Sequence, residues 1–441
     1  MASIKYLTQG NLGSHLYKLA LPIMGTSFVQ MAYSFTDMAW LGRLSSQAVA
    51  AVGCISVFIW IATSVAFFNK VGSEVTISQS IGAGRLGEAR LYASLNATMS
   101  LVVGCSVAVL FALFAPQLVD LYLLSGVVRA EALEYFYISL WGLPAVFLTS
   151  ALFGIYNASG NSDVPFRSLL LGGVCNILLD PLFIHIFGWG VSGAAWATLM
   201  SELLSLGYFL YRLRWVDRLF DEFPLLIRPL WPQLGRIVQV GAPVATLNVL
   251  FALISVYMGR LASSVGGHIG VAALTTGGQL EALTWNTSQG ITTALCSIVG
   301  QNYAARLYDR VWATLRIALI NTLVIGLVGT LIFVFGGREL FALIVPDPVV
   351  YEVGANYLRI SGYSQIFMMI EITIQGLFYG VGRSYLPASI SIIGNTLRIP
   401  LTIWLVTLGF GLDAVWWAIS VTTILKGLAA ILALLFLRRK L

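Results

Sequence analysis

About a dozen long apolar stretches run through this chain and confine its polar residues to short segments between them. A helix needs about 20 apolar residues to cross a bilayer, and only helices or closed barrels satisfy a spanning backbone in lipid. The stretches are far longer than the roughly ten-residue strands of a barrel. Only 10% of the residues are charged and 58% are hydrophobic, against roughly 25% charged in a soluble domain. The chain is therefore predicted to be an all-α membrane protein.

Twelve transmembrane helices are expected, six in each half of the chain. A polar linker at 214–235, rich in charged residues and containing prolines, separates an N-terminal six-helix lobe at 14–213 from a C-terminal six-helix lobe at 236–437. The predicted spans are 14–39, 49–70, 91–115, 131–158, 165–187, 191–213, 236–262, 271–300, 311–336, 350–381, 387–408 and 412–437.

The second half repeats motifs of the first half in the same order. Ala20-Leu21-Pro22 corresponds to Gly241-Ala242-Pro243, and Asn176 corresponds to Asn395. Because each half holds an even number of spans, the two halves have parallel topology. Several carrier folds build two rocking bundles around a central site in this way. The fold is therefore predicted as two pseudo-symmetric six-helix bundles of a secondary transporter.

The basic residues predict the orientation of the chain in the membrane. With twelve spans both termini lie on one side, and that side collects most of the 25 lysines and arginines, as cytoplasmic loops do. We therefore expect a multi-pass protein of the cell (cytoplasmic or inner) membrane with both termini in the cytoplasm. The C-terminal tail contributes Arg438, Arg439 and Lys440 to that side, whereas Arg359, Arg398 and Lys426 lie within spans.

Several other classes of function are not supported by the sequence. The net charge of +6 is spread over short loops, so membrane lipids are expected as partners and nucleic acid is not. A G-x-x-x-x-G-K-[ST] phosphate loop is absent, the three histidines lack zinc-ligand spacing, and the four cysteines fall inside apolar stretches. No nucleophile–base pair suggests an enzyme, and no selectivity filter suggests a channel. We expect no enzymatic activity and no cofactor.

Carboxylates inside predicted spans are the main candidates for function, because a charge at the bilayer centre costs about 2.5–3.5 kcal/mol. In the first half, Tyr33 and Asp37 are one helical turn apart, as are Asn176 and Asp180, so each pair shares a helix face. Thr198 can supply a further hydroxyl. This set is predicted to hold one proton or one Na⁺, and Asp37, Asn176 and Asp180 would be the metal ligands if the ion is Na⁺. The alternative is that Asn176 and Asp180 only tie helices together.

The second half contains two further acids within spans, Glu281 and Glu371. Either could contact a cationic substrate or share a proton. Trp285 lies one turn after Glu281 and could provide an aromatic face for an organic cation, with simple packing as the alternative. For Glu202, the sequence favours neither a functional nor a structural role. In the polar segment 70–90, Glu74 and Glu88 are expected to form salt bridges with nearby basic residues.

Ordered motifs resemble those of the multidrug and toxic compound extrusion (MATE) family. They extend over nearly the whole chain and comprise Ala20–Pro22, Phe35–Asp37, Val75–Gly84, Gly154–Pro165, Asn176–Ile184, Gly190–Thr198, Val299–Asn302 and Gly411–Ile419. The resemblance implies two six-helix lobes that open alternately to either side. It further implies export of cationic or amphipathic organic compounds in exchange for H⁺ or Na⁺.

The resemblance also implies roles for individual residues. In the branch of the family with an ion site in the first lobe, the polar residues match Asp37, Asn176, Asp180 and Thr198, with Tyr33 nearby. Another branch has an acid in the seventh span, where this chain has only Asn248, although Glu371 approximately matches the tenth-span acid of that branch. We expect a monomeric antiporter. The closest alternative is a flippase for lipid-linked or polysaccharide precursors, which would need several arginines in its cavity.

Overall fold

The computed structural model describes residues 4–122, 126–221, 223–345 and 347–438. Over these ranges the chain is helical and contains no β-strand, which confirms the predicted all-α membrane fold. Glu222 of the linker and Arg439 and Lys440 of the basic tail lie outside the described residues.

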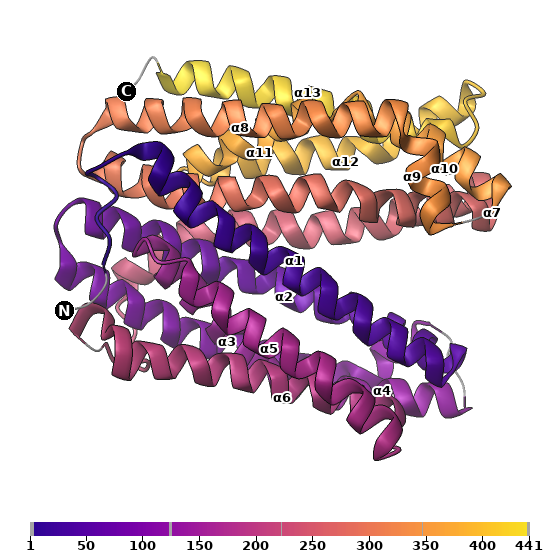
Figure 1. Cartoon of the computed structure of the whole chain (residues 1–441), viewed down its shortest axis with the longest axis horizontal. Helices are drawn as coiled ribbons and strands as arrows, with labels where there is room; N and C mark the ends of the chain where they lie inside the picture. The colour runs from indigo at the N-terminus through magenta and orange to yellow at the C-terminus, as the bar shows by residue number, and fades with distance from the viewer. Residues whose placement is uncertain (1–3, 123–125, 222, 346, 439–441) are drawn as a thin grey trace.

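The first half of the chain forms a bundle of helices (Figure 1). The chain enters it through Asn11, whose side chain accepts a hydrogen bond from the Ser14 amide and caps the first helix, as asparagine commonly does. The elements of this first bundle are α1 (Leu12–Leu44), α2 (Ser46–Gly82), α3 (Leu86–Asp120), α4 (Gly126–Ala158), α5 (Asp163–Pro181), the π-helical turn η1 (Leu182–Ile186) and α6 (Gly190–Tyr211).

A short irregular segment leads to the second bundle. It contains η2 (Arg212–Asp217) and η3 (Leu219–Asp221), and Asp217 ties it down by accepting hydrogen bonds from Arg212 and from the Tyr156 hydroxyl of α4. The helices of the second bundle are α7 (Trp231–Ala304), α8 (Tyr308–Phe335), α9 (Gly337–Ile344), α10 (Pro348–Gly362), α11 (Gln365–Gly380), α12 (Tyr385–Thr407) and α13 (Asp413–Arg438).

The helices follow the predicted spans closely. Eight helices of the described chain are long and apolar enough to cross a membrane. One of these, α7, covers two predicted spans, because Gly267 with φ 57° and ψ −147° breaks its helical backbone. The remaining predicted spans coincide with α1, with α6, and with α10 and α11 together.

One expectation about the segment 70–90 is wrong. Helix α2 continues to Gly82, so Glu74 lies inside a helix rather than beside a loop. Glu74 is buried and its carboxylate accepts a hydrogen bond from the Ser297 hydroxyl of α7 at 2.7 Å. Glu88 does form the expected kind of contact, an ion pair with Arg85 at 2.8 Å. The apolar pattern of α2 stops earlier than its helix, because its last turns contact the second bundle through small and polar residues such as Gly82 and Glu74.

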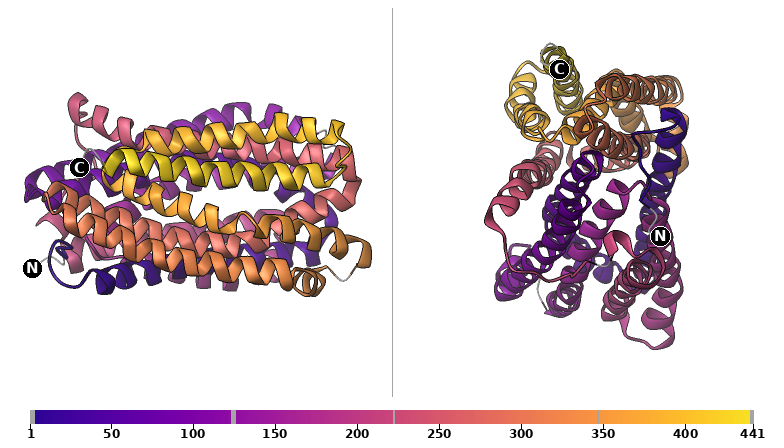
Figure 2. Two further views of the ribbon diagram at one scale, coloured as in Figure 1. Left: turned by 90° about the horizontal axis from the view of Figure 1, so that it is seen from above. Right: turned by 90° about the vertical axis from the view of Figure 1, so that its left-hand side faces the viewer.

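Both termini lie at one end of the molecule (Figures 1 and 2), as an even number of crossings requires. We call this the terminal end. The two bundles meet there and diverge toward the opposite end (Figure 1). Polar contacts between the bundles gather at the terminal end: besides Ser297 and Glu74, the Gln79 amide of α2 donates to the Gly380 carbonyl of α11 at 2.8 Å.

Candidate functional site

Two acids from different helices of the first bundle share one buried cluster. Tyr33 and Asp37 project from α1, and Asn176 and Asp180 from α5. Asp180 is fully buried, Asp37 is partly buried, and Tyr33 and Asn176 line one small cavity between the two helices. The structure thus brings together residues that are well over one hundred positions apart in the chain.

Few hydrogen bonds stabilise this cluster. The Asn176 amide nitrogen lies 3.3 Å from Asp180 Oδ1 and 3.5 Å from Thr198 Oγ1 of α6. Three buried oxygens have no hydrogen-bond partner: Asp37 Oδ1, Asp180 Oδ2 and Asn176 Oδ1. Across the described ranges no lysine or arginine forms an ion pair with either acid. Because a buried unsatisfied polar atom costs about 1–3 kcal/mol, this arrangement suits a bound cation or proton.

A small cavity adjoins the cluster between α1, α5 and α6. Its walls include Tyr33, Asn176, Thr198 and Glu202, and its volume of about 10 Å³ is close to the minimum for one water molecule. The helices approach closely here because α5 carries small residues; a Cβ atom on Gly173 would lie 3.0 Å from the Val29 side chain. Glu202 therefore belongs to the polar surroundings of the site, a placement the sequence left open.

Tyr135 of α4 is a buried neighbour of this cluster that the sequence analysis missed. Its buried ring lies within range of the charges of both Asp37 and Asp180. No motif or helical spacing pointed to it, because it comes from a fourth helix. Next to Asp180, α5 ends at Pro181 and continues as the π-helical turn η1, a local irregularity of the kind often found at functional sites.

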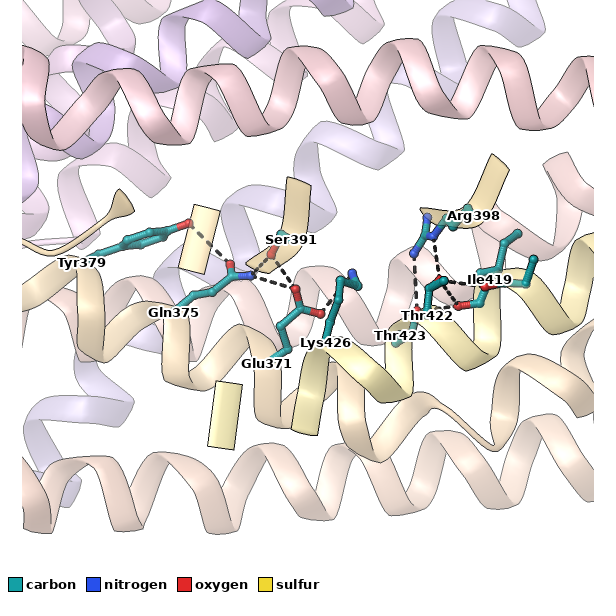
Figure 3. A network of polar contacts seen from close by, with 10 residues as sticks. Glu371, Gln375, Tyr379, Ser391, Arg398, Ile419, Thr422, Thr423 and Lys426 are labelled. Carbon is teal, nitrogen blue, oxygen red and sulfur yellow. Dashed lines mark hydrogen bonds and ion pairs between the residues drawn. The ribbon is translucent and has the colours of Figure 1, made fainter. Parts of the chain in front are cut away.

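The acid Glu371 of the second bundle lies in a different environment. Its Oε2 atom forms an ion pair with Lys426 of α13 at 3.1 Å. Its Oε1 atom accepts hydrogen bonds from Ser391 Oγ at 2.6 Å and from Gln375 Nε2 at 3.2 Å. Figure 3 shows this network, with Tyr379 extending it through Gln375. The charge of Glu371 is therefore compensated inside the protein.

Glu281 of α7 forms a second, smaller network. Tyr357 of α10 donates its hydroxyl to Glu281 Oε2 at 3.0 Å, and the Gln365 amide lies 3.3 Å from Oε1. Trp285, one turn further along α7, is 38% exposed. The three predicted substrate residues thus lie in the second bundle, and the networks of Glu281 and Glu371 are separate from the acids of the first.

The two bundles therefore differ in electrostatic character. Asp37 and Asp180 have no basic partner in the described structure, whereas Glu371 has Lys426 and Glu281 has neutral donors. Helical spacing could have revealed the contact between Glu371 and Gln375 but not the one with Lys426, which comes from another helix.

Comparison with known proteins shows which family shares this sequence pattern and architecture. The family model MatE matches twice, at residues 22–182 and at residues 243–404. The "Probable multidrug resistance protein NorM" of Thermotoga maritima is 29% identical over 397 residues, covering 87% of this chain and 84% of that protein. An FAD transporter of Shewanella oneidensis is 23% identical, covering 96% of this chain and 94% of its own.

Solved structures show the same fold. The outward-facing conformation of a multidrug resistance MATE family transporter of the MOP superfamily aligns with a TM-score of 0.91 at 24% sequence identity, covering 98% of this chain and 97% of that one.

Proposed function

This chain belongs to the multidrug and toxic compound extrusion (MATE) family, and from that premise we propose that it exports cationic or amphipathic organic compounds in exchange for H⁺ or Na⁺. Matches of the family model in both halves and apolar helices throughout make it a multi-pass transporter of the multidrug efflux type. The relative from Thermotoga maritima is itself named a multidrug resistance protein, which supports small organic cargo for this chain.

The unpaired acids of the first bundle are the observation that carries the proposal of ion coupling. Asp37 and Asp180 present buried oxygens without partners, so the cluster is most stable when it holds a proton or a cation. Asn176 Oδ1 and Thr198 Oγ1 add neutral oxygens, which would complete a Na⁺ site. Ion entry down its gradient provides about 2.3 kcal/mol per charge per 100 mV, which can drive export.

Coupling requires that the ion prefer one packing of the bundles, since a ligand shifts an equilibrium only through differential affinity. The present conformation is joined at the terminal end and splayed at the other (Figure 1). With both termini in the cytoplasm, as we propose for a protein of the cytoplasmic membrane, this is the outward-open state. Ion binding at Asp37 and Asp180 then repacks α1 against α5 and lowers the affinity for cargo on the outside.

Removing either acid tests this proposal. Asp37→Asn and Asp180→Asn, reconstituted in lipid vesicles, are expected to reduce ion-driven efflux of a fluorescent organic cation at least tenfold. Separately imposed pH and Na⁺ gradients identify the ion that drives the unmodified protein. Full coupled transport by both variants would contradict the assignment.

Asp163→Asn is the matched control, because it makes the same chemical change in the same bundle. Asp163 lies on the surface in an ion pair with Arg167 at 2.7 Å, and surface pairs contribute about 0–1 kcal/mol. This variant is expected to transport normally. A loss of transport equal to that of Asp37→Asn would show that the bundle, rather than the site, is sensitive to losing a carboxylate.

The alternative of a flippase for anionic lipid-linked precursors requires several free basic groups. Of the three basic residues that lie deepest within predicted spans, Lys426 is neutralised by Glu371 and Arg359 is exposed on α10. Arg398 is then the one candidate left among the three. A single positive charge suits a small amphipathic cargo better than a pyrophosphate headgroup, which carries several negative charges. We further propose that the protein works as a monomer, without a cofactor and as a transporter rather than an enzyme.

A further inference from the structure

Arg398 of α12 is a guanidinium held in place by neutral groups. Its Nε atom donates to Thr422 Oγ1 and its Nη2 atom to Thr423 Oγ1, both at 3.3 Å. The two threonine hydroxyls donate their own hydrogens to backbone carbonyls of α13. Their oxygens are therefore oriented to accept hydrogen bonds from Arg398. Figure 3 shows the side chain directed at this pair of threonines. The guanidinium is thus fixed in direction without losing its charge.

No carboxylate in the described chain lies within ion-pair distance of Arg398. Glu371 already pairs with Lys426, which lies one turn from Thr422 on the same helix. Glu281 and Glu371 act on Arg398 only through longer-range attraction. The Nη1 atom of Arg398 also has no hydrogen-bond acceptor among the described residues, although an arginine offers five donors.

Arg398 also lies at the boundary between the two bundles. Its guanidinium carbon is 5.9 Å from the ring centre of Phe251 on α7. The Phe251 ring in turn meets Trp60 of α2, in the first bundle, edge to face at 6.4 Å. Phe251 and Trp60 are 37% and 43% exposed. A fixed cation and two partly exposed aromatic rings, one from each bundle, therefore adjoin one another.

We propose that Arg398 is a cargo-binding residue that recognises a carboxylate on amphipathic aromatic compounds. The planar guanidinium suits a carboxylate because it can donate two parallel hydrogen bonds, and Phe251 and Trp60 supply surfaces for an aromatic ring. The inference rests on the proposed export function and assigns to Arg398 the recognition of zwitterionic cargo, in which a cationic group accompanies the carboxylate. In such a cargo the anionic group contacts the second bundle.

The test compares a zwitterionic xanthene dye bearing a free carboxylate with the methyl ester of the same dye, a cation of nearly equal size. The unmodified protein in vesicles is expected to export both dyes. Arg398→Gln is expected to reduce export of the carboxylate dye about tenfold, as for the loss of a charge-assisted hydrogen bond, and to leave export of the ester within twofold. Equal effects on the two dyes would overturn the proposal.

Two further measurements keep the result decisive. Arg359→Gln removes one positive charge from an exposed position on α10 and is expected to spare both dyes. Should Arg398→Gln fail to fold, competition is measured on the unmodified protein: 2-naphthoate should inhibit export of the carboxylate dye at least fivefold more strongly than its methyl ester does. Equal inhibition overturns the inference. Failure of the unmodified protein to export either dye under any ion gradient refutes the export function instead.

Discussion

A lysine ammonium deep among apolar helices is retained here because one carboxylate and one glycine accommodate it. Lys426 Nζ lies 3.1 Å from Glu371, and Ser391 and Gln375 satisfy the other carboxylate oxygen. Gly394 of α12 provides the room, since a Cβ atom there would collide with the Lys426 side chain. Removing one member of a buried ion pair leaves an isolated charge, which is far more costly than removing both.

Lys426→Met is therefore expected to lower the free energy of unfolding in detergent by about 3–5 kcal/mol. The double variant Glu371→Gln with Lys426→Met should regain most of that stability, because no charge is then left unpaired. The control is Arg338→Met, which breaks an exposed pair with Glu352 and should cost at most about 1 kcal/mol. Equal destabilisation by the single and double variants would show that Lys426 acts through packing rather than charge.

At the scale of whole helices, α2 and α7 make the central contact between the bundles. Glycines permit their close approach: a Cβ atom on Gly82 would overlap the backbone of Gln301, and one on Gly300 would overlap Ser78 Oγ. The buried hydrogen bond from Ser297 to Glu74 lies in the same contact. Because no side chain can yield where backbone meets backbone, this contact is either fully formed or broken.

Gly82→Leu should therefore prevent closure at the terminal end. We expect transport to fall at least tenfold, and a cysteine introduced at the buried Ser78 to become reactive toward a polar maleimide. Gly87→Leu is the control, because a Cβ atom on Gly87 meets nothing within 4 Å. Normal transport with an unreactive Ser78→Cys in the Gly82→Leu protein would mean that α2 and α7 accommodate the larger side chain without separating, which would contradict the prediction.

In the molecule as a whole, the N-terminal segment at residues 5–10 contacts both bundles at the terminal end, and we call it the strap. The Lys5 amide donates to the Ser159 carbonyl of the first bundle at 2.9 Å. The Leu7 amide donates to Gln301 Oε1 of the second bundle at 2.8 Å, and the Gln301 amide donates to the Ala158 carbonyl of the first, also at 2.8 Å. Opening the terminal end, which alternating access requires, must break these bonds.

Gln301→Leu removes the two bonds of its side chain to Leu7 and Ala158 at nearly constant volume and should shift the equilibrium toward the state open at the terminal end. Net hydrogen-bond contributions of about 0.5–1.5 kcal/mol each predict a shift of roughly 1–3 kcal/mol. Spin labels at Gly87 and Leu307, in a protein without its native cysteines, should report longer distances between the bundles. Gln239→Leu, at an exposed site in the other span of α7, should leave the distances unchanged. Unaltered distances in Gln301→Leu would contradict a strap function.

Local sequence was sufficient to predict the helices, the membrane fold and which residues share one helix face. Apolar length predicts a span whatever it packs against, and a spacing of four residues places Asp180 beside Asn176 in any helix. The acids of the candidate ion site could therefore be named from the chain alone. Their neighbour Tyr135 could not, because nothing in its own helix marks it.

Only the tertiary structure decided which charges are compensated. Lys426 and Arg398 look alike in sequence, as basic residues within spans, yet one meets Glu371 and the other meets two threonines. Glu74, which the sequence predicted beside a loop, is buried and accepts a hydrogen bond from Ser297. The physical reason is that a residue's own sequence sets the face of its helix, whereas the crossing angle and depth of the partner helices determine what that face meets.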